Sequence, residues 1–196
     1  MELRRSDLEP DPLAQFAAWF LAAGQAGVPV PEAMALATAS AEGAPSARMV
    51  LLKGFDERGF VFFTGYGSRK GRELAANPRA ALLFHWQPLG RQVRVEGSVT
   101  QIPAEESDAY FRSRPLRSRL SAIASDQSGP VGARAELEAR VAALAGDPDP
   151  PRPADWGGYA LAPAAYEFWQ HRDDRLHDRF RYERDGAHWR IDRLQP

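Results

Sequence analysis

The sequence predicts a mainly β protein with flanking helices, and two observations support this class. Short apolar and β-branched segments follow one another with turns between them and without long intervening helices, which is typical of an antiparallel sheet or barrel. Amphipathic helical patterns precede and follow this run. With 196 residues, the chain is long enough for one domain with a substantial core.

The composition excludes several classes of function. The net charge is −1, from 25 Lys and Arg against 26 Asp and Glu, so nucleic acid is a poor partner and any anion site must be local. The absence of cysteine excludes disulfides, thiolate metal sites and a cysteine nucleophile. The four histidines lack the spacing of helix-borne metal ligands, and we expect no metal. Without an apolar run of about 20 residues or the apolar core of a signal peptide, the expected location is the cytoplasm.

The N-terminal region is expected to form an arm followed by a helix. Residues 1–10 are charged and end in a proline, which favours a flexible arm, and residues 11–196 are expected to form a single domain. Asp11 followed by Pro12 is typical of a helix start, with an N-cap residue and proline at the first helical position. Apolar residues with helical spacing from Leu13 onward predict an amphipathic helix that ends at one of the next two glycines.

Five short strands are expected in the first half of the chain, separated by turns rich in glycine, proline and charged residues. These strands cover residues 34–39, 47–53, 60–64, 80–86 and 92–101. A short helix, capped by Ser68, is expected between the third and fourth strands and ends before Pro78.

The second half of the chain begins with helical patterns and ends with a hairpin. Helices are expected at residues 103–112, 115–125 and 131–145, followed by a proline-rich connector at 146–153. The Asp185-Gly186 pair between aromatic and β-branched runs predicts a β-hairpin. Arg175, His177 and Arg179 alternate just before it, so we expect them on one face of a strand. Their cations either form a solvated patch or face an anion.

Three other segments combine cations with hydrogen-bond donors. Ser68-Arg69-Lys70 places two cations at a helix N-terminus, where they are mildly destabilising unless an anion binds, so a phosphate site is one interpretation. Residues 110–119 hold four arginines, two serines and a tyrosine without an acid, which indicates a basic surface patch or a second phosphate pocket. Residues 48–53 place a cation at each end of an apolar strand and, alone, are typical of a core strand.

Taken together, these segments resemble the pyridoxine 5′-phosphate oxidase family. The resemblance extends from about Arg4 to Pro196 and depends on several motifs in the same order. The matching segments are residues 48–53, 62–64, 67–70, 91–93, 110–115, 127–128, 167–170, 175–179 and 189–196. Two positions depart from the family pattern. Phe63 stands in place of tyrosine and lacks its hydroxyl, and Ser6 replaces a basic residue of an arm that covers the substrate in the family.

The resemblance implies a split β-barrel that binds FMN at the interface of a homodimer. It assigns the phosphate and ribityl end of the flavin to Arg48, Arg69, Lys70, Gln127 and Ser128. It implies further cofactor contacts for Phe63, Thr64, Gln92, Trp169 and Arg179, and for Met49, Val50, Leu51, Leu52 and Lys53. It assigns the substrate phosphate to Lys53, Tyr110, Arg114 and Ser118, and the substrate ring to the catalytic pair Arg175 and His177.

The implied reaction oxidises pyridoxamine or pyridoxine 5′-phosphate to pyridoxal 5′-phosphate. A hydride passes from C4′ of the substrate to N5 of FMN, and O2 reoxidises the flavin and yields hydrogen peroxide, with ammonia released from the amine substrate. A cation at Arg179 would stabilise the reduced flavin. Two alternatives remain open: a related flavin oxidase of another pathway, such as phenazine biosynthesis, and a flavin- or pyridoxal-phosphate-binding protein without catalysis.

Overall fold

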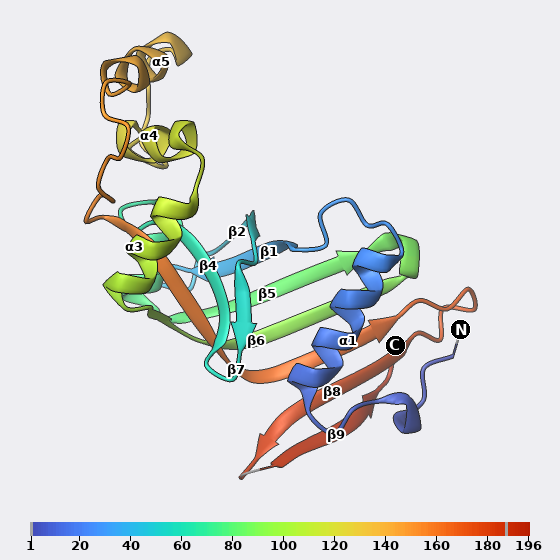
Figure 1. The fold of residues 1–196 in the computed structure, drawn as a ribbon. Helices are drawn as coiled ribbons and strands as arrows, with labels where there is room; N and C mark the ends of the chain where they lie inside the picture. The colour runs from blue at the N-terminus through green and yellow to red at the C-terminus, as the bar shows by residue number, and fades with distance from the viewer. Residues whose placement is uncertain (1, 187) are drawn as a thin grey trace.

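One antiparallel sheet organises the computed structural model, which describes residues 2–186 and 188–196 (Figure 1). Within these residues the sheet has nine strands, in the order β2-β1-β5-β6-β7-β4-β3, with β8 and β9 branching from β7. The strands are β1 (Ala33–Ala39), β2 (Pro45–Leu51), β3 (Gly54–Asp56), β4 (Gly59–Gly65), β5 (Arg79–Trp86), β6 (Arg91–Gln101), β7 (Trp156–Gln170), β8 (Asp178–Asp185) and β9 (His188–Leu194). The predicted class and all five predicted early strands are confirmed, whereas β3 and the long first part of β7 were not predicted.

Strand β7 is where the sheet divides. One edge of β7 pairs with β6 from Arg91↔Gln170 to Gln101↔Tyr159. Its other edge pairs first with β4 and then, from Ala165 onward, with β8. A β-bulge between Glu96 and Gly97 faces the point of division, and a Cβ at Gly97 would lie only 2.0 Å from the Ala162 carbonyl oxygen. Glycine is therefore required where the two backbones approach each other.

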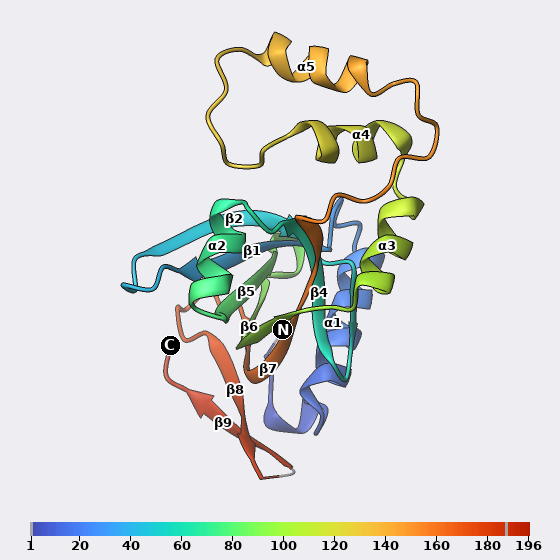
Figure 2. The same ribbon diagram turned by 90° about the vertical axis from the view of Figure 1, so that its left-hand side faces the viewer.

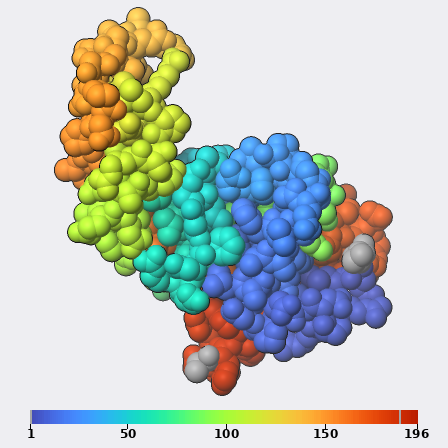
Figure 3. Space-filling view, in the orientation of Figure 1, coloured from blue at the N-terminus to red at the C-terminus, as the bar shows by residue number. Residues whose placement is uncertain are grey.

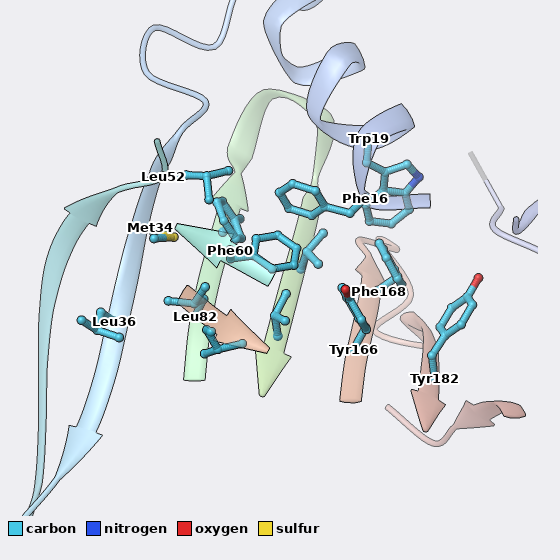
Figure 4. Close-up of a cluster of buried hydrophobic side chains, with 14 of the residues drawn as sticks. Phe16, Trp19, Met34, Leu36, Leu52, Phe60, Leu82, Tyr166, Phe168 and Tyr182 are labelled. Carbon is cyan, nitrogen blue, oxygen red and sulfur yellow. The ribbon is translucent and has the colours of Figure 1, made fainter. Parts of the chain in front are cut away.

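Helix α1 (Pro12–Gln25) covers the inner face of the curled sheet and supplies the centre of the core. Asp11 caps it as predicted, because its side chain accepts a hydrogen bond from the Leu13 backbone N–H at 3.2 Å. The fully buried Phe16 meets Phe60 edge to face, with 4.8 Å between ring centroids (Figure 4). Such ring pairs add about 1 kcal/mol each to the burial of their surface.

The described residues form four further α-helices. They are α2 (Arg69–Ala76), α3 (Ala104–Ser113), α4 (Leu116–Ala124) and α5 (Arg134–Ala143), each within one to three residues of the bounds expected at its two ends. Figures 2 and 3 show α4 and α5 standing out from the rest of the molecule as a helical hairpin. No helix in the described part of the chain is long and apolar enough to cross a membrane.

The strand predicted across Arg175, His177 and Arg179 begins only at Asp178. Arg175 lies in a turn before it and has a left-handed φ of 66°. The Asp174 carboxylate stabilises this turn by accepting a hydrogen bond from the backbone N–H two residues later, at 3.0 Å. The prediction that the three cationic side chains share one strand face is therefore wrong, because the turn removes Arg175 and His177 from the strand. The predicted β8–β9 hairpin is confirmed.

The N-terminal segment, expected to be a flexible arm, packs against the β8–β9 hairpin. Leu3 and Leu8 are buried there. The Leu3 backbone N–H donates to Asp178 Oδ2 at 2.9 Å, and Arg193 donates both to Asp178 Oδ1 at 2.8 Å and to the Leu3 carbonyl oxygen at 3.0 Å. Burial disfavours the ionised Asp178 carboxylate, but these hydrogen bonds outweigh it and hold its pKa below the usual value.

We expect Asp178→Ala to release this segment. The change removes a buried acceptor of two hydrogen bonds, so it should lower the free energy of unfolding by about 2 kcal/mol and speed amide hydrogen exchange near Leu3. The exposed Asp173, whose side chain contacts His171, offers a matched control as Asp173→Ala. Equal exchange rates near Leu3 in both variants would show that Asp178 does not hold the segment.

Candidate functional site

Polar residues from three separate segments meet at the start of α2. Gln127 Oε1 accepts hydrogen bonds from Thr64 Oγ1 at 2.8 Å and from the Gly65 backbone N–H at 3.0 Å. Ser128 Oγ accepts a hydrogen bond from the Arg69 backbone N–H at 3.2 Å. We call this group the α2 cluster, and its members are Thr64, Ser68, Arg69, Lys70, Gln127 and Ser128. The structure thus brings together five residues that the sequence predicted for the flavin.

Lys70 is the buried cation of the α2 cluster. Its side chain donates to Thr64 Oγ1 at 3.0 Å and to Ser68 Oγ at 3.3 Å, so its hydrogen-bond partners among the described residues are neutral hydroxyls. Burial lowers the pKa of Lys70, and the nearby guanidinium of Arg48 lowers it further. A bound anion would offset both effects.

Glu73, which the sequence analysis did not single out, faces β1 and β2 beside the α2 cluster. Its Oε1 accepts from Arg69 Nε at 2.9 Å, and its Oε2 accepts from Arg48 at 3.2 Å. The hydroxyls of Ser46 and Thr38 donate to the same Oε2 at 2.6 and 2.5 Å. Hydrogen bonds from Ser46, Thr38 and the two arginines outweigh the effect of burial and lower the pKa of Glu73 to about 2. The spacing of four residues between Arg69 and Glu73 on a helix was the available signal.

Three stacked aromatic rings, which we call the aromatic shelf, lie next to the α2 cluster. Phe63 stacks on Tyr110 with 3.8 Å between ring centroids, and on Trp156 with 5.5 Å. Arg114 lies over the Trp156 ring at 4.7 Å. A Cβ at Gly158 would come within 2.9 Å of the Phe63 ring, so glycine is needed there. The sequence predicted Phe63, Tyr110 and Arg114 as site residues but not Trp156.

A cavity of about 600 Å³ joins these two groups. Gly65, Ser68 and Gln127 line it on the side of the α2 cluster, and Arg114 and Ser118 line it on the side of α4. Burial lowers the pKa of Arg114. Among the described atoms, Arg114 Nη1 is buried without a hydrogen-bond partner. A buried guanidinium N–H without an acceptor is costly, which makes this wall of the cavity suited to an anion.

A second group of predicted site residues forms a row across three strands, which we call the Trp169 row. Gln92 on β6, Trp169 on β7 and Arg179 on β8 are cross-strand neighbours in register and therefore share a sheet face. The His177 ring lies 4.6 Å from the Trp169 ring, between centroids. Arg175 is exposed in the adjacent turn.

The buried Glu167 orients Arg179 within this row. Its two carboxylate oxygens accept from Arg179 Nε and from Arg94, each at 2.7 Å. The hydrogen bond with Glu167 raises the pKa of Arg179. Sequence reasoning missed Glu167 as a functional residue, although it lies in a matching motif.

The single chain does not assemble all the predicted residues at one place. Among the described residues, no hydrogen bond, ion pair or ring contact joins the Trp169 row to the α2 cluster or to the aromatic shelf. Lys53, directly before β3, is exposed. Arg48 and Met49 on β2 point to opposite faces of the sheet, so even adjacent predicted residues serve different surfaces.

Two family matches together cover most of the chain. Residues 20–146 match the family described as pyridoxamine 5′-phosphate oxidase. Residues 156–196 match the pyridoxine 5′-phosphate oxidase C-terminal dimerisation region.

Relatives named pyridoxine/pyridoxamine 5′-phosphate oxidase resemble the chain over nearly its whole length. The protein of Bordetella petrii is 62% identical over 94% of this chain and 89% of its own. That of Cupriavidus pinatubonensis is 59% identical over 99% of this chain and 93% of its own.

Solved structures agree with these matches. PhzG from Burkholderia lata 383, in complex with tetrahydrophenazine-1-carboxylic acid, is 37% identical, with a TM-score of 0.94 over 100% of this chain and 98% of that chain. A pyridoxamine 5′-phosphate oxidase-related, FMN-binding protein from Nostoc punctiforme is 20% identical, with a TM-score of 0.76 over 96% of this chain and 100% of its own, which is a likeness of fold. From its sequence matches, supported by this likeness, the chain belongs to the pyridoxamine 5′-phosphate oxidase family.

Proposed function

We propose that the protein is an FMN-dependent oxidase that converts pyridoxamine 5′-phosphate and pyridoxine 5′-phosphate to pyridoxal 5′-phosphate, with O2 as the electron acceptor. The observation that carries this proposal is the cavity that Ser68 and Gln127 of the α2 cluster line on one side and Arg114 and Ser118 line on the other. These are two separate sets of phosphate-type donors around one space. The names of relatives that are 59% and 62% identical support the same reaction.

The α2 cluster fits the phosphate end of FMN. Lys70 is buried among hydroxyls, so an anion at this point would stabilise its charged form. The Ser68 hydroxyl, whose oxygen accepts from the Gly71 backbone N–H and from Lys70, would donate its own proton to a phosphate oxygen. When bound, FMN would accept the hydride from C4′ of the substrate and pass electrons to O2.

The opposite wall of the cavity fits the phosphate of the substrate. Arg114 can present its guanidinium to two phosphate oxygens at once, and Ser118 can donate its hydroxyl. Tyr110 and Lys53 are proposed to complete this binding set. The Trp156 ring of the aromatic shelf covers one side of the Arg114 guanidinium, which removes part of its solvation and would strengthen its ionic contacts.

The Trp169 row is proposed to reach the cofactor from a second copy of the chain. Its members, and the substrate-ring residues Arg175 and His177, make no contact with the α2 cluster in one chain, as described above. In a homodimer, one protomer can supply the α2 cluster while its partner supplies the row. The match of residues 156–196 to a dimerisation region supports this arrangement, because these residues carry the row's Trp169 and Arg179.

An open apolar sheet face is available for the second copy. Met49 and Leu51 on β2 are 66% and 41% exposed. Their cross-strand partners on β1 are Ala35 and Ala33, and Leu83 on β5 continues the same face. Both α1 and α2 lie on the other face, where they meet Phe84 and Thr38. A large apolar surface of this kind is typical of a protein interface.

A second candidate is a flavin oxidase of phenazine biosynthesis, favoured by the likeness to PhzG across the whole chain. The substrate-phosphate set argues for the phosphorylated substrate, because a carboxylate without phosphate would not need both Arg114 and Ser118. The two candidates therefore predict different ligands at this wall of the cavity, a phosphorylated substrate for the first and a phenazine carboxylate for the second.

Turnover separates these possibilities. Mixed with pyridoxamine 5′-phosphate without oxygen, the purified yellow protein should lose its visible flavin absorbance. Readmitted O2 should then restore the absorbance and produce hydrogen peroxide. Bleaching by a tetrahydrophenazine carboxylate alone would favour the second candidate. A flavin that stays oxidised with both compounds would indicate that the protein binds flavin without catalysing either reaction.

Substitution of Arg114 tests the substrate-phosphate set. We expect Arg114→Ala to raise the KM for pyridoxamine 5′-phosphate about 10- to 100-fold, because a charge-assisted hydrogen-bond pair to phosphate is lost. Competitive inhibition by inorganic phosphate should weaken in parallel. Arg112→Ala is the matched control, since Arg112 is exposed in the same segment and does not line this cavity. Similar KM values for the two variants would argue against this set.

If the open sheet face forms the dimer interface, a charge placed on it should weaken the dimer. Met49→Asp should raise the dimer dissociation constant at least about 100-fold, because a charge would be buried at an apolar interface. Sedimentation should then show monomers that bind flavin poorly. Leu21→Asp on α1 is the control, because Leu21 is equally exposed at 62% but lies outside this face. A dimer that survives Met49→Asp must use another surface.

A further inference from the structure

We infer that Glu73 is a positioning residue, whose carboxylate holds Arg48 and Arg69 at the flavin phosphate. This inference rests on the proposed function and deepens it. The family motifs do not include Glu73, and it does not line the cavity. Its side chain is 8% exposed and lies behind the cations, against the hydroxyls of β1 and β2.

Each oxygen of Glu73 holds one guanidinium from a different element. Oε1 accepts from Arg69 on α2 at 2.9 Å, and Oε2 accepts from Arg48 on β2 at 3.2 Å. The Ser46 and Thr38 hydroxyls fix Oε2 at 2.6 and 2.5 Å. With both oxygens held, the carboxylate cannot turn without breaking several hydrogen bonds. The two arginines are therefore placed before any ligand arrives.

The same contacts determine how each arginine can act. Arg48 also donates to the Leu36 carbonyl oxygen at 3.1 Å and to the Thr38 and Ser46 hydroxyls, so it would act on a phosphate mainly through its charge. Arg69 uses its Nε for Glu73, and its side chain is 61% exposed. Its two terminal nitrogens have no hydrogen-bond partner among the described residues, so they remain available to a phosphate.

The charges of this group also match a phosphate monoester. Arg48, Arg69 and Lys70 contribute three positive charges and Glu73 one negative charge, which leaves +2. A phosphate monoester carries about −1.5 to −2 at neutral pH. Without Glu73, the three cations would repel one another. Arg48 already lowers the pKa of Lys70, which shows that this repulsion is felt at the lysine. Glu73 remains ionised at all working pH values, because its own pKa is about 2.

Two variants separate positioning from simple charge. Glu73→Gln removes both the charge and one strong acceptor, whereas Ser46→Ala keeps every charge and removes one hydroxyl that holds both the carboxylate and Arg48. The readout is the ratio of affinities for FMN and riboflavin, measured by flavin fluorescence on flavin-free protein, because riboflavin lacks the phosphate. Thermal melting checks the fold of each variant. Glu138→Gln, which breaks an exposed ion pair with Arg134, is the control.

If Glu73 positions the arginines, both variants should lower the ratio of the affinities for FMN and riboflavin. The decrease should be at least about tenfold for Glu73→Gln, as expected for the loss of one charge-assisted hydrogen bond. It should be several-fold for Ser46→Ala. A higher ratio in Glu73→Gln would overturn the inference, since Glu73 would then compete with the phosphate. Equal losses for both flavins would reduce Glu73 to a structural role and also overturn it. If Glu73→Gln does not fold, Ser46→Ala decides alone. Wild-type protein that binds neither flavin would instead remove the proposed function, and the inference with it.

Discussion

The division of the sheet at β7 is the constraint on which the other features depend. A strand has two edges, and β7 gives one edge to β6 and shares the other between β4 and β8. This is possible because β7 has 15 residues and a bulged partner with glycine at the point of closest approach. Trp156 at its start belongs to the aromatic shelf, and Trp169 near its end belongs to the Trp169 row. Thirteen residues of extended strand separate them by roughly 40 Å. One chain therefore cannot place both tryptophans at one small molecule.

The candidate site holds two buried cations, Lys70 and Arg114, that have no ion-pair partner among the described residues. Several arginines form exposed ion pairs, such as Arg58 with Asp56 and Glu106, that contribute little to stability. At the site, Lys70 and Arg114 are removed from water, and burial lowers the pKa of each. A protein that retains buried cations among hydroxyls and aromatic rings stores an electrostatic cost that an anionic ligand can offset. This is the physical basis for the proposal that each of these two cations binds a phosphate.

Sequence patterns correctly predicted the structural features that depend only on neighbouring residues. The Asp11-Pro12 start of α1, the Ser68 cap of α2 and the Asp185-Gly186 turn each depend on neighbouring residues, and all three are confirmed. Alternation alone misplaced Arg175 and His177, because a side chain–backbone turn ends the strand pattern there. The packing of Leu3 on Asp178 could not be predicted, since it joins residues 175 positions apart. Family motifs proposed ligand-binding residues but gave no role to Glu73 or Glu167, which contact other side chains.

Strand β2 shows why cofactor binding and association are expected to be linked in this protein. Its alternation sends Arg48 toward Glu73 and the α2 cluster, and sends Met49 and Leu51 to the open face. A shift of the strand by one residue would exchange these faces and disturb both at once. Under the proposed arrangement, docking of a second copy on Met49 would press β2 against the side that holds Arg48. A bound flavin, held between the two protomers, would in turn stabilise their association, because any ligand that contacts both copies favours the dimer over the monomer.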